Sequence, residues 1–147
     1  MLINENRIFI DEELKDKDEL FEFIAKKAEK ECIIKDYKIC ISDFKEREKQ
    51  ISTGLQEGFA IPHCRSENVK ECSIFYVRNK YPIDWETLDG SKVNNIIAIL
   101  VPKYGTENQY LELIAEIATN LLEDDFKLSL NNASSKNEIL KIFNREE

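Results

Sequence analysis

The sequence predicts an α/β (α+β) fold: a mixed β-sheet flanked by helices on both faces, forming a three-layer α/β/α sandwich. Residues 96–101 are apolar without interruption, which is typical of a central strand buried on both faces. Segments near both ends of the chain instead carry apolar residues at helical spacing. The expected order is one strand, two helices, three strands and three helices. The 147 residues fit a single domain, residues 1–147.

The N-terminal part is expected to supply the first strand and two helices. Residues 7–10 alternate weakly and suit a short strand. Asp16 or Asp18 can cap the next helix, because a short acidic side chain accepts from the free N–H groups of a first turn. That helix covers about residues 18–31, and a second one covers about residues 36–49.

The middle of the chain is expected to be mostly extended. Ser52-Thr53-Gly54 breaks the second helix, and residues 59–61 are a short apolar run that suits a strand or an ordered loop. Residues 73–77 are rich in β-branched and aromatic side chains, as a strand should be. Tyr81-Pro82 and Asp89-Gly90 are turn signals.

The C-terminal part reads as helical. Thr106-Glu107-Asn108-Gln109 is a capping-box sequence that precedes an apolar stripe over residues 111–122. A shorter helical segment around residues 126–130 follows. Ser135-Lys136-Asn137-Glu138 is a second capping box and opens the last helix.

Composition argues against several classes of function. The formal net charge of −8 repels nucleic acids and anionic membranes, so neither is expected as a partner. No apolar run is long enough to span a bilayer and no signal peptide is visible, so a cytoplasmic location is expected. The four cysteines form no C-x-x-C pair, and a single histidine cannot complete a zinc set. No glycine-rich nucleotide motif occurs, so no cofactor or metal is expected.

The single histidine, His63, is the candidate reactive group. On composition alone a lone histidine is more often structural than functional. His63, however, follows Pro62 at the exit of an apolar segment, where a loop could present it to solvent. Imidazole is a neutral nucleophile near pH 7, and a phosphohistidine needs one free nitrogen, a fixed tautomer, and donors or a cation around the phosphoryl oxygens.

Arg47, Thr53 and Gly54 are candidates for those supporting contacts. The planar guanidinium of Arg47 suits phosphate, and the alternative interpretation is a solvated charge at a helix end. Thr53 offers a hydroxyl and Gly54 a backbone N–H. Cys64 adjoins His63, but successive residues of an extended chain point to opposite sides, so a Cys-His dyad is not expected.

These residues resemble a known signature. Arg47-Glu48, Ser52-Thr53-Gly54 and Gly58-Phe59-Ala60-Ile61-Pro62-His63 resemble the blocks of the fructose/mannitol-type enzyme IIA domains (EIIA type 2) of the bacterial sugar phosphotransferase system (PTS). Ile83-Asp84-Trp85, Asp89-Gly90 and the strand before Pro102 fit as well, so the resemblance covers nearly the whole chain.

The resemblance implies a phosphotransferase component. Members accept a phosphoryl group from HPr on the histidine and pass it to a cysteine of an EIIB partner, while a membrane EIIC permease moves the sugar. Carried over, His63 is the phosphoryl acceptor and Arg47 stabilises the phosphate. The family fold, a mixed sheet between helices, agrees with the predicted element order. A second hypothesis is a regulatory module that signals the phosphorylation state to a transcriptional regulator.

Tyr110 departs from the family pattern. Many members carry a second active-site histidine at this position, and galactitol-type members resemble this chain in lacking it and in having Pro-His-Cys. A galactitol-like subgroup is therefore expected. Tyr110 is expected either to donate its hydroxyl to the site or to serve as an interfacial aromatic of its helix. The sugar and the oligomeric state do not follow from the sequence.

Overall fold

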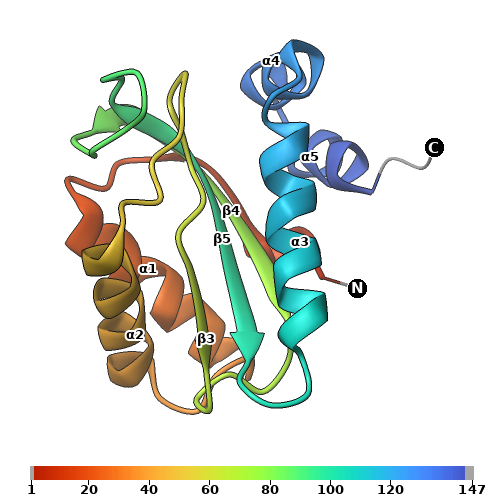
Figure 1. Ribbon diagram of the computed structural model, residues 1–147. Coiled ribbons are helices and arrows are strands. Elements are labelled where there is room, and N and C mark those ends of the chain that lie inside the picture. The colour runs from red at the N-terminus through yellow and green to blue at the C-terminus, as the bar shows by residue number, and fades with distance from the viewer. Residues whose placement is uncertain (1, 145–147) are drawn as a thin grey trace.

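The computed structural model describes residues 2–144. Its strands are β1 (Ile8–Glu12), β2 (Phe59–Ala60), β3 (His63–Ser66), β4 (Ser73–Ile83) and β5 (Val93–Pro102). Its helices are a 3-10 turn η1 (Glu5–Arg7), α1 (Lys17–Lys30), α2 (Tyr37–Gln50), α3 (Glu107–Asn120), α4 (Asp124–Asn132) and α5 (Lys136–Phe143). Helices α1 and α2 cover one face of the sheet and α3 to α5 lie on the other, so the predicted three-layer sandwich is confirmed (Figure 1).

The five strands form one mixed sheet in the order β1-β4-β5-β2, with β3 also pairing with β5. Strand β1 is parallel to β4, β4 is antiparallel to β5, and β2 and β3 are parallel to β5. Strand β5 has neighbours on both edges and helices over both faces. Its residues 96–100 are all fully buried, which accounts for the unbroken apolar run in the sequence.

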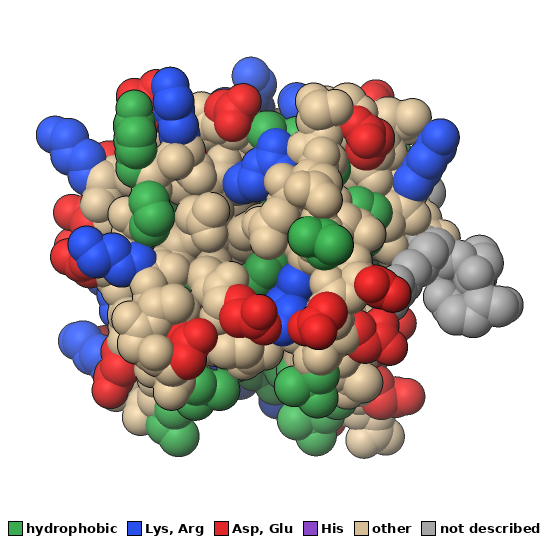
Figure 2. Space-filling view, turned by 90° about the horizontal axis from the view of Figure 1, so that it is seen from above, with side chains coloured by type: hydrophobic (Ala, Val, Ile, Leu, Met, Phe, Trp, Pro, Cys, Tyr) green, Lys and Arg blue, Asp and Glu red, His purple; other side chains and the backbone are tan. Residues whose placement is uncertain are grey.

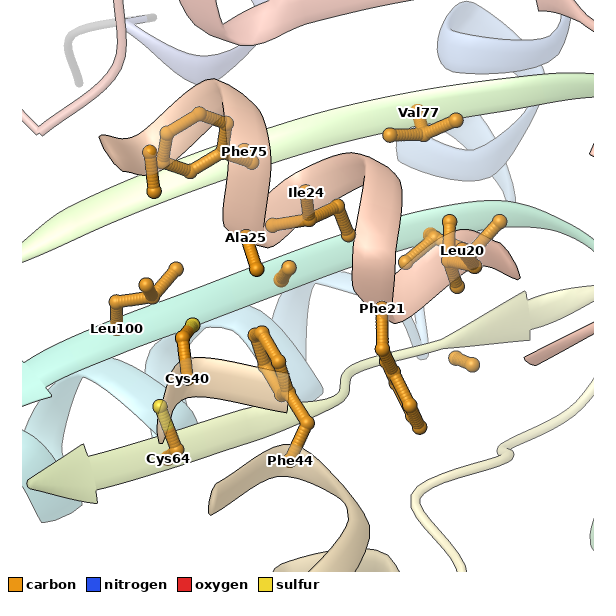
Figure 3. Close-up of a cluster of buried hydrophobic side chains, with 14 of the residues drawn as sticks. Leu20, Phe21, Ile24, Ala25, Cys40, Phe44, Cys64, Phe75, Val77 and Leu100 are labelled. Atoms are coloured by element: carbon orange, nitrogen blue, oxygen red, sulfur yellow. The ribbon is translucent and has the colours of Figure 1, made fainter. Parts of the chain in front are cut away.

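Alternation along the strands divides the apolar core into two. One cluster lies under α1 and α2, where Phe21 stacks on Phe44 at 5.1 Å between ring centroids. Figure 3 shows this cluster, with Phe75, Val77 and Leu100 pointing from β4 and β5 toward the helices. The other cluster lies under α3 to α5 and takes the intervening strand residues. Each face of the sheet is thus packed by its own helical layer.

Two predicted helix starts are confirmed by their capping bonds. The Asp16 side chain accepts from the Glu19 N–H at 2.9 Å, and the Ser135 side chain accepts from the Glu138 N–H at 3.2 Å. The capping box predicted at Thr106 is wrong. Thr106 precedes α3, but its hydroxyl donates to the Pro102 carbonyl at 2.5 Å and makes no capping bond.

The extended segments differ from the sequence prediction in two places. The residues after Pro62, expected as a loop, form strand β3, so four strands rather than three follow α2. Tyr81-Pro82 was predicted as a turn but lies inside β4. The pairing of β4 with β5 is irregular between Arg78 and Ile83, and this is where a proline without an N–H can be accommodated.

The surface carries charges of both signs. Figure 2, which views the molecule from above relative to Figure 1, shows acidic and basic side chains interspersed on that face. Between residues 2 and 144, no helix is long and apolar enough to cross a membrane.

Candidate functional site

His63 is the first residue of β3 and pairs in register with Ile99 of β5. It is only 5% exposed, so the expectation of a histidine held out on a loop is wrong. Two features bury it. Strand pairing fixes the backbone, since the Ile99 N–H donates to the Pro62 carbonyl at 3.0 Å. The first turns of α3 then cover this face of the strand with Tyr110 and other side chains.

A cavity of about 360 Å³ lies next to His63. It joins the end of α2, the segment before β2, and α3. The lining side chains are Arg47, Ser52, Thr53, Leu55, Ile61, His63, Tyr110, Leu111 and Ile114. Residues far apart in the sequence therefore meet here: the structure brings together Arg47, Thr53, His63 and Tyr110 of the predicted site. Gly54 is not among the lining residues.

The tautomer of His63 follows from its backbone contact. Nδ1 lies 2.8 Å from the carbonyl oxygen of Ile61, and a carbonyl oxygen can only accept, so Nδ1 carries the proton. Nε2 then holds the lone pair, and it has no hydrogen-bond partner among residues 2–144. Burial lowers the pKa of His63 below its usual range. The bond to Ile61 and the charge of Glu48 oppose this, while the charge of Arg47 adds to it. At neutral pH the imidazole is therefore an uncharged nucleophile.

Arg47 projects from the last turn of α2 toward the cavity. Its Nη1 donates to the Ile51 carbonyl at 2.9 Å, which satisfies one of the carbonyl groups near the helix end and fixes the side chain. No other hydrogen bond of the guanidinium is formed within the described part of the chain. Arg47 is thus anchored at one nitrogen and offers the remaining donors to the cavity.

Thr53 is buried, and both of its donors are already used. Its N–H donates to Glu48 Oε2 at 2.9 Å and its hydroxyl to Glu48 Oε1 at 2.7 Å. Glu48 Oε2 also accepts from the Trp85 indole at 3.0 Å. In this structure Thr53 therefore forms part of the cavity wall and presents no free donor.

Gly54 is required by packing. A Cβ atom at this position would lie 2.3 Å from the Glu86 carbonyl oxygen and 2.8 Å from the Thr87 side chain. Its N–H points to the Ser52 hydroxyl at 3.2 Å. Because Gly54 has no side chain, the segment before β2 can lie close to residues 85–87. Thr53, the residue before Gly54, lines the same cavity as His63.

The Tyr110 ring packs edge-on against His63, with centroids 5.9 Å apart and an interplanar angle of 61°. Cζ of Arg65 also lies near this ring, 5.8 Å from the Tyr110 ring centroid. The Tyr110 hydroxyl makes no hydrogen bond within residues 2–144. Both sequence hypotheses thus have a geometric basis, because Tyr110 contacts His63 while also lying at the edge of the α3 interface.

Cys64 points away from His63, as strand alternation predicted. It lies in the cluster under α1 and α2, with its side chain beside that of Cys40 (Figure 3). The interaction with the neighbouring Cys40 thiol and burial raise the pKa of the Cys64 thiol well above its usual range. The thiol is therefore protonated and is separated from the cavity by the strand itself.

Sequence reasoning missed two residues that contact the cavity wall without lining the cavity themselves. Glu48 was noted only as part of a matched block, yet it holds Thr53 and Trp85 in place. Arg65 follows His63 by two residues, so it projects from the same face of the strand, a signal that would have revealed it once β3 was recognised. Over residues 2–144, no group of three or more His, Cys, Asp and Glu side chains is arranged to hold a metal ion.

A family model described as "Phosphoenolpyruvate-dependent sugar phosphotransferase system, EIIA 2" matches residues 1–146. The chain belongs to this family. The resemblance noted from the Ala-Ile-Pro-His block is thereby confirmed.

Three similar proteins illustrate the range of the family. The fructose-specific EIIABC component of Bacillus subtilis (strain 168) is 28% identical over 146 residues, which cover 99% of this chain but 23% of that protein. The nitrogen regulatory protein IIA-Ntr of Neisseria meningitidis has a crystal structure with a TM-score of 0.89 and 30% identity, covering 96% of this chain and 95% of that one. The complex of Escherichia coli enzyme IIAMtl with phosphorylated enzyme IIBMtl gives a TM-score of 0.78 at 16% identity, with 95% coverage of both chains, and shows the shared fold.

The chain thus spans less than a quarter of the Bacillus subtilis relative. The names of these relatives refer to fructose, mannitol and nitrogen regulation, so they give no support to the galactitol-like subgroup expected from Pro-His-Cys.

Proposed function

We propose that this chain is a phosphoryl carrier that accepts a phosphoryl group from HPr on Nε2 of His63 and passes it to a cysteine of an EIIB partner. The observation that supports this is the state of the imidazole. Nδ1 is committed to the Ile61 carbonyl, while Nε2 is unprotonated and without a partner among residues 2–144, beside a cavity that also contains Arg47.

The transfer requires no change in the tautomer of His63. The Nε2 lone pair attacks the phosphorus atom of phosphohistidine on HPr, a P–N bond forms, and the P–N bond to HPr breaks with its electron pair returning to the HPr imidazole. In the second half the thiolate of EIIB attacks the same phosphorus and the electron pair returns to Nε2. Arg47 offsets the charge on the phosphoryl oxygens, since such transfer depends on positioning and electrostatics.

The Escherichia coli complex of enzyme IIAMtl with phosphorylated enzyme IIBMtl supports EIIB as the kind of partner. Phe59 and Ile61 are apolar residues close to His63 in the sequence, but both are buried, at 0% and 5% exposure, so they offer no contact surface to a partner. Leu111, which lines the cavity, is an apolar side chain that is 64% exposed. Ile51 and Leu88, at 73% and 77%, line a neighbouring hollow that shares Ser52 with the cavity. We expect HPr and EIIB to compete for this surface, because both must reach Nε2.

The 30% identity and high structural similarity to IIA-Ntr favour a second candidate, a regulatory carrier that signals the phosphorylation state. Phosphorylation of His63 is common to both functions. The transfer to EIIB separates them, and finding EIIB and EIIC genes beside the gene for this chain would support the transport role and identify the partner to test.

The experiment is transfer of labelled phosphate from phospho-HPr to the chain and onward to EIIB. His63→Ala should carry no label. Arg47→Ala should slow transfer on the order of 10²-fold, by analogy with the loss of one charge-stabilising donor, and Arg47→Lys should recover part of the rate. Lys49→Ala is the matched control. It removes an exposed cation two residues after Arg47, at the same end of α2, that does not line the cavity.

Full labelling of His63→Ala would refute the proposal. Labelling of the wild type without any transfer to EIIB would refute the transport role and leave the regulatory one.

A further inference from the structure

Arg65 lies two residues beyond His63 on the same face of β3. His63 pairs with Ile99 and Arg65 with Val101, and both of these β5 residues point into the core under α3 to α5. Residues i and i+2 of a strand are about 7 Å apart, a distance that an arginine side chain can span. The Arg65 guanidinium does not line the cavity beside His63 while it contacts Lys103 and Glu107. Its side chain is nevertheless long enough to turn toward a group attached to Nε2 of His63.

The contacts of Arg65 use only one edge of its guanidinium. Nε and Nη2 donate to the Lys103 carbonyl at 3.0 and 2.6 Å, and Nη2 also pairs with Glu107 Oε1 at 2.5 Å. Nη1 has no hydrogen-bond partner in the described part of the chain. The side chain is anchored near the start of α3, yet two of its N–H groups are uncommitted.

Tyr110 connects Arg65 to His63. Its ring contacts the imidazole at a centroid distance of 5.9 Å and lies 5.8 Å from Cζ of Arg65. Arg65 and His63 thus both contact the Tyr110 ring, and a guanidinium moving across that ring keeps a favourable cation–π contact.

The charge of the phosphorylated site calls for another cation. A phosphoryl group brings roughly −1.5 to −2 charge at pH 7. The charged side chains that act on His63 are Arg47 and Glu48, which have opposite signs. Arg65 is paired at present with Glu107, whose side chain is 63% exposed, and an exposed ion pair is worth little. A charge-assisted bond to phosphoryl oxygen is stronger.

We infer that Arg65 is a second phosphoryl-binding residue, whose Nη1 donates to the phosphoryl group on His63 while its ion pair with Glu107 loosens. This inference rests on the proposed function, because it requires phosphorylation of His63. Arg47 and Arg65 would then hold the group from two sides, one at the end of α2 and the other on β3.

The phosphoryl group is loaded with phosphoramidate, a chemical donor to histidine, so the titration does not depend on HPr and only the equilibrium measurement requires it. The pKa of the phosphoryl group is measured by ³¹P NMR titration, together with the exchange equilibrium with phospho-HPr. Arg65→Gln should raise that pKa and shift the equilibrium away from this chain by about tenfold. Glu107→Gln releases Arg65, so it should shift both quantities in the opposite direction. Arg65→Lys should lie between Arg65→Gln and the wild type.

A purely structural role predicts a different pattern. Arg65→Gln and Glu107→Gln both weaken the attachment of α3 to β3, so changes of the same sign would overturn the inference. Lys103→Gln is the matched control, because it removes one exposed positive charge at the same end of the site. If it changed the phosphoryl pKa as much as Arg65→Gln does, the pKa would respond to the overall positive charge nearby and not to a contact with Arg65. Thermal unfolding of each variant checks that it is folded.

The two proposals fail in different ways. Absence of any adduct on His63 with both donors would refute the proposed function and this inference together. An adduct whose phosphoryl pKa is unchanged in Arg65→Gln would refute the inference alone.

Discussion

Glu48 is expected to hold the wall of the cavity beside His63, and its removal should lower the stability of the fold. Glu48→Ala strands two N–H groups, that of Thr53 and that of the Trp85 indole, on residues that are only 4% and 8% exposed. Each buried unpaired donor costs about 1–3 kcal/mol, so the free energy of unfolding should fall by roughly 2–6 kcal/mol. A loss of about 4 kcal/mol corresponds to roughly 8–16 °C in Tm for a domain of this size.

Glu48→Gln is the matched variant. The amide oxygen of the variant side chain can still accept from the Thr53 N–H and the Trp85 indole. The amide NH₂ can donate to the Thr53 hydroxyl, so this hydroxyl changes from donor to acceptor. Only the charge is lost, so we expect a destabilisation of about 1–2 kcal/mol. Urea unfolding of the wild type and both variants measures these values, and transfer from phospho-HPr should slow most in the alanine variant. A loss below 1 kcal/mol in Glu48→Ala, or equal losses in both variants, would show that the three bonds do not support the wall.

Two further predictions concern His63 and Gly54. The pKa of His63 is lower in the folded protein than its unfolded value near 6.5. The neutral imidazole therefore contributes stability that is present above pH 6.5 and is lost as the pH falls through the folded pKa. Between pH 7.5 and 5 the wild type should lose more stability than His63→Gln, and parallel pH profiles of the two proteins would contradict the lowered pKa. Gly54→Ala forces a Cβ against the Glu86 backbone and should cost about 2 kcal/mol or more in chemical unfolding. Gly90→Ala meets no atom within 4 Å and should cost only about 1 kcal/mol, for its positive φ; equal losses in the two variants would show that crowding at Gly54 is unimportant.

The helical layers could be predicted from sequence because their signals are local. Residues 18–31 were expected as a helix and α1 spans Lys17–Lys30, since the apolar spacing and the Asp16 cap both lie within the segment. The buried strand β5 was equally clear, because a strand covered on both faces is apolar at successive positions.

The surroundings of His63 could not be predicted because they depend on distant segments. Strand β3 has only four residues and owes its extended form to pairing with β5, a partner more than thirty positions away. The burial of His63 depends on Tyr110 and its neighbours on α3. Glu48 was overlooked because acidic residues are common in this chain, and only the fold shows which one receives the Thr53 and Trp85 donors.

The alternation of β3 also limits how this site can change in evolution. Inserting or deleting one residue between Phe59 and His63, with the pairing to β5 kept, would turn Cys64 toward the cavity and bury the imidazole beside Cys40. The altered protein would place a thiol among groups arranged for an imidazole. A change of two residues would restore the original facing, so length variation in this segment should be tolerated only in even steps.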